Sequence, residues 1–392
     1  MGRVMLCSAR QTVSLAAVAA LVLTGALGVV PATSQASPTT GPAAGPDLRL
    51  GAPDGEDVRS ATVPLGRGLL HASRAGARTE PLSTTTYSMV GFTWRGAEPD
   101  IAVRTRADGG WSHWRQVHPL TDGQAADGKE ASTLVWVDRS EGVQVRTNGQ
   151  TARALDLVLI DPGVLPGDTA AGEVDRTGSA TALPRTSSRI ATSAPSPDLH
   201  TRKEWGADPT WRNGTPRYNS TLKQVHVHHT ASGNGYSRAD VPGILRGMYR
   251  YHTQTLGWFD IGYNFLVDRF GRAWVGRSGG ANRLVRGAHT LGFNNTSVGI
   301  ALIGNLENRA PWPDAVTGVV KLAAWKLDTY GRDAVGSVRV TSTGSDKYPD
   351  GTKVRLPVID GHRDTNDTAC PGRAYGKLPE IRKRAQWRID HW

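Results

Sequence analysis

The chain has 392 residues, which is long enough for two domains that each bury a core of their own. Its formal net charge of +11 at pH 7 suits an anionic partner, for example nucleic acid, a membrane surface or an acidic wall polymer. After the first 36 residues no apolar run could span a bilayer, so we expect the bulk of the chain to lie outside the membrane.

The first 36 residues have the pattern of a secretory signal peptide. Arg3 and Arg10 form a basic start, residues 13–30 are an apolar run, and the small residue Ala36 suits cleavage. The alternative is an uncleaved membrane anchor, because the run approaches the length that spans a bilayer. A run rich in Ala and Gly rather than Leu and Ile favours the signal peptide, and therefore a secreted, extracellular protein.

Removal of the signal would leave one cysteine. Cys7 would leave with the signal and Cys370 would remain, so no intramolecular disulfide could form although the compartment permits one. A lone thiol in an exported protein needs a reason, and metal binding is a good one. The signal holds two arginines and no acidic residue, so the mature chain keeps a net charge of 11 − 2 = +9. Export also makes nucleic acid the least expected of the anionic partners.

A small all-β domain is predicted at residues 85–161. It follows residues 37–84, where Pro, Gly, Ala, Ser and Thr dominate and a flexible segment is expected. Between Ile101 and Arg106 apolar side chains alternate with polar ones, which is typical of a strand with one buried face. Residues 134–137 and 155–160 are more continuously apolar, as strands in the centre of a sheet are.

Four tryptophans fall within this predicted domain: Trp94, Trp111, Trp114 and Trp136. One interpretation makes some of them a platform that binds sugar or cell wall. The other makes them core residues, because Trp fills a large buried volume in a small sheet. Nothing in their spacing marks them as exposed, so the second interpretation is favoured. The domain itself could attach the protein to the wall or act as a spacer.

A second domain is predicted at residues 200–392, after a linker at 162–199 that is rich in Ser, Thr, Ala, Pro and Gly. Its periodicity changes between that of strands and that of helices, which indicates an α/β fold. We expect strands at 224–229, 262–267, 297–303 and 356–360, and helices at about 238–253, 314–330 and 377–390.

Zinc-type ligands gather in two distant segments of this domain. The first is a strand with His226, His228 and His229, in which alternation places His226 and His228 on one face and His229 on the other. The second is a loop, GHRDTNDTACPG, that contains His362 and Cys370. A single histidine would more often be a hydrogen-bonded structural residue. Three histidines together with a His/Cys pair favour a metal site.

The number of ligands bears on the role of such a site. Structural zinc is closed by four protein ligands, whereas catalytic zinc keeps one position open for water. One thiolate and two imidazoles make three ligands. Zinc held in this way lowers the pKa of bound water and polarises a carbonyl, which together support hydrolysis of an amide.

These segments resemble the family of peptidoglycan recognition proteins and type-2 N-acetylmuramoyl-L-alanine amidases. The matching motifs stand in the family order and cover nearly all of residues 200–392. They read TRKEWGA (201–207), VHHTA (227–231), YHTQTLGWFDIGYNFLVD (251–268), GAHTLGFNNTSVGIALIGN (287–305) and GHRDTNDTACPG (361–372). The combination is highly specific, although HHT alone would be weak.

The resemblance implies a mixed central sheet flanked by helices, with zinc at the floor of a groove for glycan and stem peptide. It implies that one Zn²⁺ ion is bound by His228, His362 and Cys370. Tyr263 matches the tyrosine of the hydrolytic members, and its hydroxyl would orient water or stabilise the developing charge. Thr368 matches a position that contacts the oxyanion. Taken alone, Tyr263 would be a buried strand aromatic and Thr368 a turn threonine.

The resemblance also implies a set of substrate-binding residues, which comprises Thr230, His252, His289 and Asn294. For His252 a structural role is nearly as plausible, because it fits the apolar face of its helix. The chain departs from the family between the strand near Val275 and Gly287, where members carry residues that select the third residue of the stem peptide. No preference for diaminopimelate or lysine can be transferred, although Arg283 or Arg286 could meet a free carboxylate.

The expected function is that of a secreted, zinc-dependent hydrolase. It would cleave the amide between N-acetylmuramic acid and the L-alanine of the stem peptide in peptidoglycan. The protein is expected to be a monomer without integral membrane association after signal cleavage. The alternative is a recognition protein that binds peptidoglycan without cutting it, as members that lack the cysteine ligand do. The presence of Cys370, His228 and Tyr263 favours the enzyme.

Overall fold

The computed structural model describes residues 47–52, 57–66, 68–73, 76–121, 123, 125–148, 153–173 and 194–392. The predicted signal peptide, residues 1–36, lies outside this part of the chain, as does much of the predicted linker. Among the described helices none is both long and apolar enough to cross a membrane.

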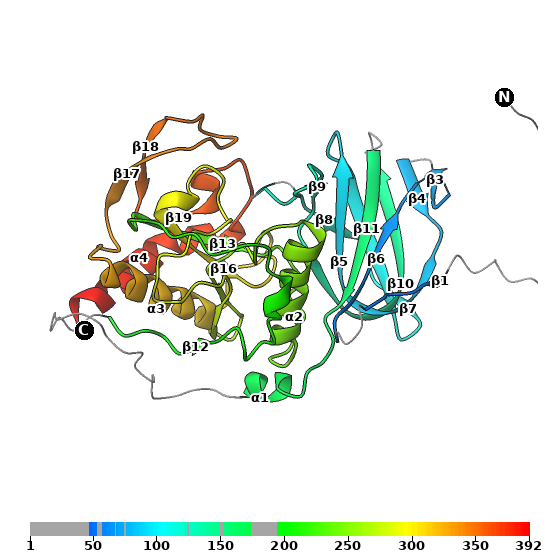
Figure 1. Ribbon diagram of the computed structural model, residues 1–392, viewed down its shortest axis with the longest axis horizontal. Helices are drawn as coiled ribbons and strands as arrows, with labels where there is room; N and C mark the ends of the chain where they lie inside the picture. Colours follow the sequence, from blue (N-terminus) through cyan, green and yellow to red (C-terminus); the bar gives the residue numbers. More distant parts are fainter. Residues whose placement is uncertain are drawn as a thin grey trace, which may run out of the picture. The chain divides into compact units, whose positions relative to one another are not determined.

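The N-terminal region is all β, as predicted (Figure 1). Its strands are β1 (Asp47–Leu48), β2 (Arg59–Pro64), β3 (Leu70–Ser73), β4 (Gly76–Thr79), β5 (Leu82–Arg95), β6 (Asp100–Ala107), β7 (Gly110–Trp111), β8 (Arg115–Val117), β9 (Glu130–Ala131), β10 (Val135–Asn148) and β11 (Arg153–Asp161). They form one sheet of order β2-β11-β5-β10-β4-β3, in which β1 and β9 pair with β5, and β6 pairs with β10, β7 and β8.

This sheet begins earlier than predicted. Strands β2, β3 and β4 lie within residues 37–84, where a flexible segment was expected. β2 and β3 are the two ends of the strand order, and most of their residues are exposed or half-buried. Edge strands of this kind need few large apolar residues, so they leave little hydrophobic signal in the sequence.

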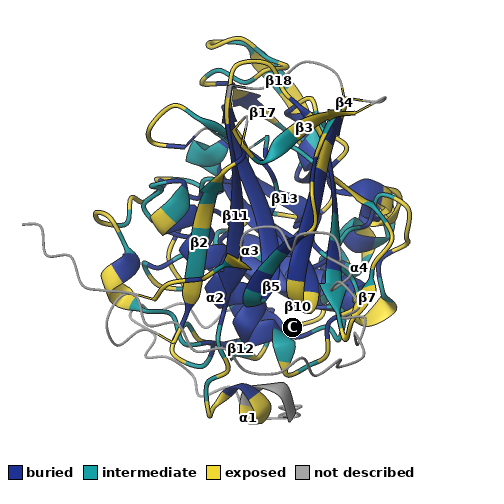
Figure 2. Ribbon diagram, turned by 90° about the vertical axis from the view of Figure 1, so that its right-hand side faces the viewer, coloured by how far each residue is buried: buried dark blue, intermediate teal, exposed yellow. Residues whose placement is uncertain are grey.

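The central strands of this sheet are buried on both faces, and Figure 2 shows β5 and β11 coloured as buried along much of their length. One face forms the core of the β region, with Phe92 of β5 and Leu157 of β11. The alternate residues, such as Met89 and Val158, belong to a second apolar cluster. Two buried faces explain why residues 157–160 are continuously apolar rather than alternating.

The tryptophans of the β region divide between the two interpretations. Trp94 and Trp136 are buried, with 3% and 6% of their surface exposed. Trp111 and Trp114 are half-buried and lie at the surface. The interpretation as core residues therefore holds for Trp94 and Trp136 and does not hold for Trp111 and Trp114.

The C-terminal region has a mixed sheet flanked by helices, which confirms the predicted fold class. Its sheet contains β12 (Leu199–His200), β13 (Gln224–His229), β14 (Phe265–Val267), β15 (Ala273–Val275), β16 (Ser297–Leu302) and β19 (Ile359–Gly361). The order is β12-β15-β14-β16-β13-β19, and β14 runs antiparallel to β15 while the other pairs are parallel. A separate hairpin pairs β17 (Ser337–Thr341) with β18 (Lys353–Pro357).

The predicted helices are present as α2 (Asp240–Arg250), α3 (Pro313–Thr329) and α4 (Leu378–Asp390). Helix α2 continues into a π-helical turn at Tyr251–Thr255. The predicted strand at 356–360 overlaps the end of β18 and most of β19. Helices α3 and α4 contact each other and pack against one face of the sheet, and Figure 1 shows them beside it.

Helix α2 covers the other face of this sheet and also contacts the N-terminal β region. Ile244 and Met248 of α2 share one apolar cluster with Leu266 of β14 and with Met89 and Trp136 of the β region. The hydroxyl of Tyr251, just after α2, donates to the backbone carbonyls of Phe92 and Ser132 at 3.0 Å each. The two sheets are therefore joined by a shared apolar layer.

The start of the predicted linker is anchored to α2 as well. A short helix, α1 (Asp168–Glu173), begins within it. Arg246 of α2 is 1% exposed and bonds both carboxylate oxygens of Asp168, at 2.8 and 2.6 Å. Its guanidinium also donates to the carbonyls of Pro162 and Gly163. A buried bidentate pair of this kind holds residues 162–168 in place.

Candidate metal centre

Two parallel strands bring the histidines of the distant segments together. β13 and β19 are neighbours, with Val225 opposite Ile359 and Val227 opposite Gly361. The next residue on each chain is His228 and His362, so both imidazoles emerge at the carboxyl ends of adjacent strands. Their ring centroids are 4.6 Å apart. The strand register therefore brings together two histidines that are more than a hundred residues apart in the sequence.

The predicted alternation along β13 is confirmed. His226 and His228 point to one face, where both rings lie close to that of His289, at 5.9 and 5.0 Å between centroids. His229 points to the other face, and its Nδ1 accepts the backbone N–H of Leu306 at 3.0 Å. His228 is thus available to the site, and His229 is used to hold a neighbouring loop.

Cys370 completes a group of three donors. Its Sγ lies 3.8 Å from Nδ1 of His228 and accepts the backbone N–H of His229 at 3.3 Å. Ligand atoms of His228, His362 and Cys370 all lie within 4.8 Å of one another, and all three residues are buried. Around tetrahedral zinc a sulfur and a nitrogen ligand are about 3.6 Å apart, because the bonds are about 2.3 and 2.0–2.1 Å long. The donor set is one that zinc prefers, and the distance of 3.8 Å between Sγ of Cys370 and Nδ1 of His228 is close to this value.

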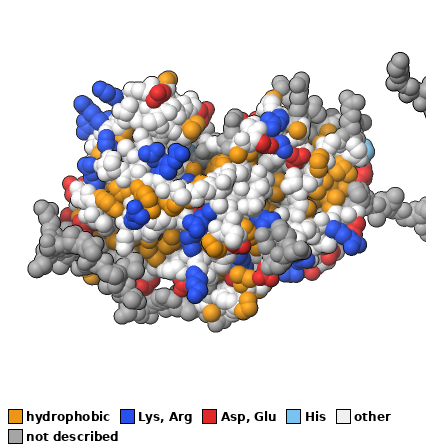
Figure 3. Space-filling view, in the orientation of Figure 1, with side chains coloured by type: hydrophobic (Ala, Val, Ile, Leu, Met, Phe, Trp, Pro, Cys, Tyr) orange, Lys and Arg blue, Asp and Glu red, His pale blue; other side chains and the backbone are white. Residues whose placement is uncertain are grey.

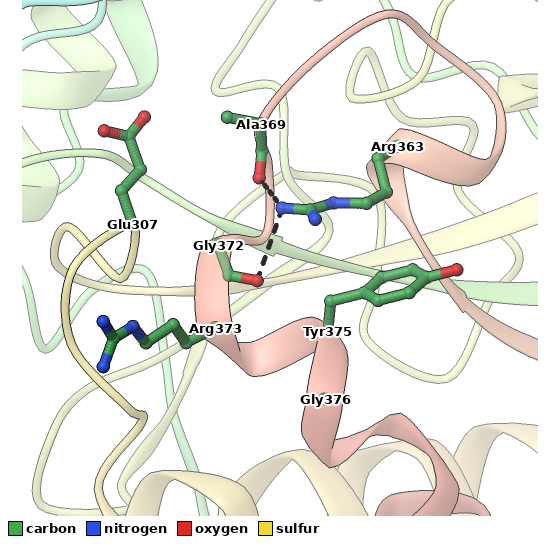
Figure 4. Close-up of a pocket in the computed structure, with 7 residues that line it drawn as sticks. All are labelled: Glu307, Arg363, Ala369, Gly372, Arg373, Tyr375 and Gly376. Carbon is green, nitrogen blue, oxygen red and sulfur yellow. Dashed lines mark hydrogen bonds between the residues drawn. The ribbon is translucent and has the colours of Figure 1, made fainter.

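Arg363 supports the loop that carries Cys370. Figure 4 shows its guanidinium reaching the carbonyls of Ala369 and Gly372, and its Nε also donates to the carbonyl of Cys370 at 3.4 Å. These bonds tie the residues on both sides of the thiol to the residue after His362. A pocket of about 610 Å³ lies beside this loop. Its lining residues are Glu307, Arg363, Ala369, Gly372, Arg373, Tyr375 and Gly376, none of which is a predicted site residue.

His289 supports His228 from behind. Its Nδ1 is 3.1 Å from Nε2 of His228, and both rings are buried. Burial, followed by the neighbouring His362, lowers the pKa of His228 well below its ordinary value, so its imidazole is neutral. If Nε2 carries the proton and donates it to His289, Nδ1 of His228 keeps a free lone pair toward Cys370.

Two glycines make room for the His289 ring. A Cβ at Gly299 would lie 2.4 Å from Cγ of His289, and one at Gly287 would lie 2.2 Å from its Cδ2. Neither distance is compatible with a side chain at these positions. Sequence reasoning placed His289 in the substrate groove and did not find its contact with His228, because the sequence does not show which imidazole approaches which.

A buried acid near the site was not predicted either. Asp360 lies directly before Gly361 in β19, and its Oδ1 is 2.5 Å from Nδ1 of His226. The side-chain amide of Gln224 donates to its other oxygen at 3.2 Å. Burial raises the pKa of Asp360, and His226 opposes that shift. The register that pairs His226 with Asp360 is the same one that aligns His228 with His362.

The two predicted catalytic residues approach different members of the group, Tyr263 the ring of His228 and Thr368 the backbone of Cys370. The ring of Tyr263 is 5.4 Å from that of His228, between centroids, and the residue is 6% exposed. Thr368 lies in the loop before Cys370, and its Oγ1 accepts the backbone N–H of Cys370 at 3.2 Å. The threonine therefore shapes the turn that presents the thiol.

The predicted substrate-binding residues make internal contacts. Oγ1 of Thr230 accepts the N–H of Gly304 at 2.9 Å, and Oδ1 of Asn294 accepts the N–H of His289 at 2.9 Å. His252 is buried, and its ring lies 4.8 Å from that of Trp258, between centroids, with the ring planes tilted by 31°. Burial, and to a lesser extent Arg277, lowers its pKa to about 3. These contacts position the backbone around the site, and substrate contact by the four residues stays a prediction.

Arg283 and Arg286, in the segment between Val275 and Gly287 that departs from the family, both hydrogen-bond to neighbouring side chains. Arg283 lies 3.5 Å above the ring centroid of Tyr218 and donates to its hydroxyl at 2.7 Å. Nε of Arg286 donates to Oδ1 of Asn219 at 2.9 Å. Each guanidinium still has further N–H groups, so these contacts orient the side chains without exhausting their donors.

Comparison with protein families gives two matches along the chain. The family described as N-acetylmuramoyl-L-alanine amidase matches residues 218–373, which include the three candidate ligands. The family described as Rv3811 N-terminal galactose-binding domain-like matches residues 38–177, which include the N-terminal sheet.

Individual relatives each match a little under half of the chain. The chain is 32% identical to peptidoglycan-recognition protein SC1a of Drosophila melanogaster over 187 residues, which are 47% of this chain and 85% of the relative. It is 33% identical to N-acetylmuramoyl-L-alanine amidase of Homo sapiens over 182 residues, which are 45% of this chain and 27% of the relative. Among solved structures, Drosophila peptidoglycan recognition protein SD matches with a TM-score of 0.37 and 27% identity, over 47% of this chain and 94% of that one.

Proposed function

The chain belongs to the family of peptidoglycan recognition proteins and type-2 N-acetylmuramoyl-L-alanine amidases, and from that premise we propose that it is a secreted, zinc-dependent amidase. Its substrate is peptidoglycan, and the bond cleaved is the amide between N-acetylmuramic acid and L-alanine of the stem peptide. The observation that carries this proposal is the convergence of donor atoms from His228, His362 and Cys370 within 4.8 Å.

The donor set favours a catalytic zinc site over a structural one. Among the described residues the group of possible metal ligands has three members, which leaves one of the four tetrahedral positions for water or substrate. When bound there, zinc supplies Lewis-acid polarisation of the amide carbonyl and a nucleophile at neutral pH.

The chain's own residues prepare this site. Burial keeps His228 neutral, as a ligand must be, and His289 fixes the orientation of its ring. The backbone N–H of His229 donates to Sγ of Cys370 and so fixes the position of the sulfur beside His228. The bonds from Arg363 hold the cysteine loop in the geometry that this arrangement needs.

Tyr263 is the residue best placed to assist the reaction. Its ring lies beside His228, and a phenol O–H directed at the carbonyl oxygen would stabilise the charge that develops there. The Thr368 hydroxyl accepts from Cys370 and still has its own proton to donate, so it is proposed as a second donor. The family resemblance offers no matching glutamate as general base.

The competing function is recognition of peptidoglycan without cleavage. It uses the same fold and groove, and in the family it accompanies loss of the cysteine ligand. Cys370 is present here with its sulfur facing His228, which favours the enzyme. Measured zinc content separates the two functions: about one ion per chain is expected for the enzyme, and a value near zero for a pure binding protein.

The decisive experiment uses defined muropeptides as substrates and mass spectrometry of the products. Release of the intact stem peptide with a free L-alanine amine is expected from the wild-type protein. Cys370→Ser and His228→Ala should lower the rate by at least a hundredfold, because each removes one of three ligands. His71→Ala changes an exposed histidine of β3 and is the matched control. Unchanged release by Cys370→Ser would refute the proposed site.

A further inference from the structure

Five side chains on the surface of the N-terminal sheet form a ladder of alternating cations and aromatic rings. In order they are Arg106, Trp111, Arg104, Trp114 and Arg146. The guanidinium carbon of Arg106 is 5.6 Å from the ring centroid of Trp111, and that of Arg104 is 4.9 Å from the same ring. Arg104 and Arg146 then approach Trp114 at 5.0 and 4.7 Å. We call this group the Arg–Trp ladder.

Strand pairing explains why these residues share one face. On β6, Ile101 and Val103 point into the core, so Arg104 and Arg106 point outward. β10 pairs with β6 in a register that sets Gln144 opposite Arg104, and Arg146 therefore lies on the same outward face.

The connection between β7 and β8 folds back to bring the two rings onto this face. The N–H of Ser112 donates to the carbonyl of Thr105, and Oγ of Ser112 accepts the N–H of Thr105. Trp111 pairs with Arg106 across the β6–β7 turn. These backbone contacts fix the position of the segment that carries Trp111 and Trp114.

The ladder holds its guanidinium groups ready for an anion. Arg104 is further oriented by a bond from its Nε to Oε1 of Gln144 at 2.8 Å. A guanidinium stacked on a ring directs its N–H groups outward at the edge, where a carboxylate can accept two of them. Because the side chains are already ordered, little conformational entropy is lost on binding.

Few carboxylates lie close enough to the ladder to offset the positive charge of its arginines. Glu141 is 3.9 Å from Nε of Arg106 and is itself exposed. Among the described residues, no carboxylate lies within ion-pair distance of Arg104 or Arg146. Basic side chains form several separate groups on the face shown in Figure 3, so net charge alone does not single out a site. The regular alternation of arginine with tryptophan distinguishes the ladder from these other basic groups.

We infer that the Arg–Trp ladder binds a carboxylated polysaccharide, a chain of sugars that carries carboxylates along its length. The repeating guanidinium groups match repeating carboxylates, and the half-exposed indole rings of Trp111 and Trp114 offer apolar contact to the sugar rings between them. A nucleic acid is the less expected partner, because the chain carries the pattern of an exported protein, and DNA is therefore a comparison ligand in the test. The proposed amidase activity is not needed for this binding, which takes place on the other region of the chain.

The test is equilibrium binding of the full chain to polygalacturonate oligomers at low and at physiological salt. A neutral dextran of similar length and a single-stranded DNA of similar charge serve as comparison ligands. Arg104→Gln combined with Arg146→Gln removes two cations from the ladder. The matched control is Arg339→Gln combined with Lys353→Gln, which removes two exposed cations from the β17–β18 hairpin.

We expect the wild-type protein to bind polygalacturonate and not dextran. The ladder variant should lose at least tenfold in affinity, while the control variant stays within about twofold. Arg146→Gln alone should lose several-fold, and this single change at an exposed residue leaves the fold intact. Absence of binding, equal losses in ladder and control variants, or tighter ladder-dependent binding of DNA would each overturn the inference. Muropeptide cleavage by the ladder variant should match the wild type, so failure here is distinct from failure of the proposed function.

Discussion

His289 acts on the candidate metal site through another residue. Its ring contacts His228, and the space that it occupies exists because Gly287 and Gly299 lack side chains. A histidine that hydrogen-bonds a metal ligand fixes both the tautomer and the ring angle of that ligand. The affinity for zinc should therefore depend on residues that never touch the ion.

Gly299→Ala tests this dependence. The added methyl would lie 2.4 Å from Cγ of His289, so the ring must move and its bond to His228 must lengthen or break. We expect zinc affinity to fall about 10- to 100-fold, as it does when outer contacts of a zinc site are lost. Competition with a chromophoric chelator measures it. Gly51→Ala, where a Cβ meets nothing within 4 Å, is the control. Equal affinities in the two variants would contradict the supporting role of His289.

Helix α3 illustrates how an element positions a loop, here the one that follows β15. Lys326 of α3 is completely buried, and its Nζ donates to the carbonyls of Ala281 and Arg283 at 2.9 and 3.2 Å. These carbonyls belong to the segment that departs from the family pattern. Burial lowers the pKa of Lys326 from 10.5 to about 7. A neutral amine has two N–H groups, which is enough to serve both carbonyls.

The lowered pKa of Lys326 predicts how stability changes with pH. Between about pH 7 and 10.5 the unfolded chain binds a proton at this lysine that the folded chain does not bind. The free energy of unfolding therefore rises with pH in this window, by at most about 1.4 kcal/mol per unit. Lys326→Met removes this contribution. Urea unfolding of both proteins at about pH 7.5 and pH 9.5 should show the wild type gaining stability relative to the variant. Parallel pH dependences would show that the lysine stays charged in the fold.

At the scale of the whole molecule, the N-terminal sheet and the mixed sheet share one apolar layer through α2. Met89, Trp136 and Val158 on one side pack with Ile244 and Met248 on the other. Removal of residues 37–198 would expose this layer to water, at a cost of about 25 cal/mol for each Å² uncovered. A truncated C-terminal region therefore does not report on wall attachment alone. Point changes that leave the layer intact are the better test.

Gly233→Ala tests the coupling of the two sheets. A Cβ at Gly233 would lie 2.3 Å from the backbone carbonyl oxygen of Trp136, which belongs to β10. We expect the free energy of unfolding to fall by about 1–3 kcal/mol, as overpacking against rigid backbone costs. Gly235→Ala is the matched control in the same loop, since its Cβ would be 3.8 Å from Asp138. Calorimetry measures both. If the two variants melt alike, the contact does not couple the sheets.

Much of the C-terminal fold could be predicted because its signals are local. The alternation in residues 224–229 and the helical pattern in 313–329 depend on neighbours along the chain, and both elements form where expected. The start of the N-terminal sheet was missed, because β2 and β3 are edge strands that bury few apolar side chains. Family motifs led to His228, His362 and Cys370, whose donors do converge, and zinc binding by them stays a prediction.

From its sequence alone, this protein was recognisable as a family member with two histidines and one cysteine as candidate ligands. Tertiary structure decided that His289 supports His228, that α2 packs against both sheets, and that Trp111 and Trp114 alternate with arginines at the surface. The reason is physical. Periodicity within a strand or helix follows from bonds between near neighbours, whereas strand register and packing bring together residues that no local pattern relates.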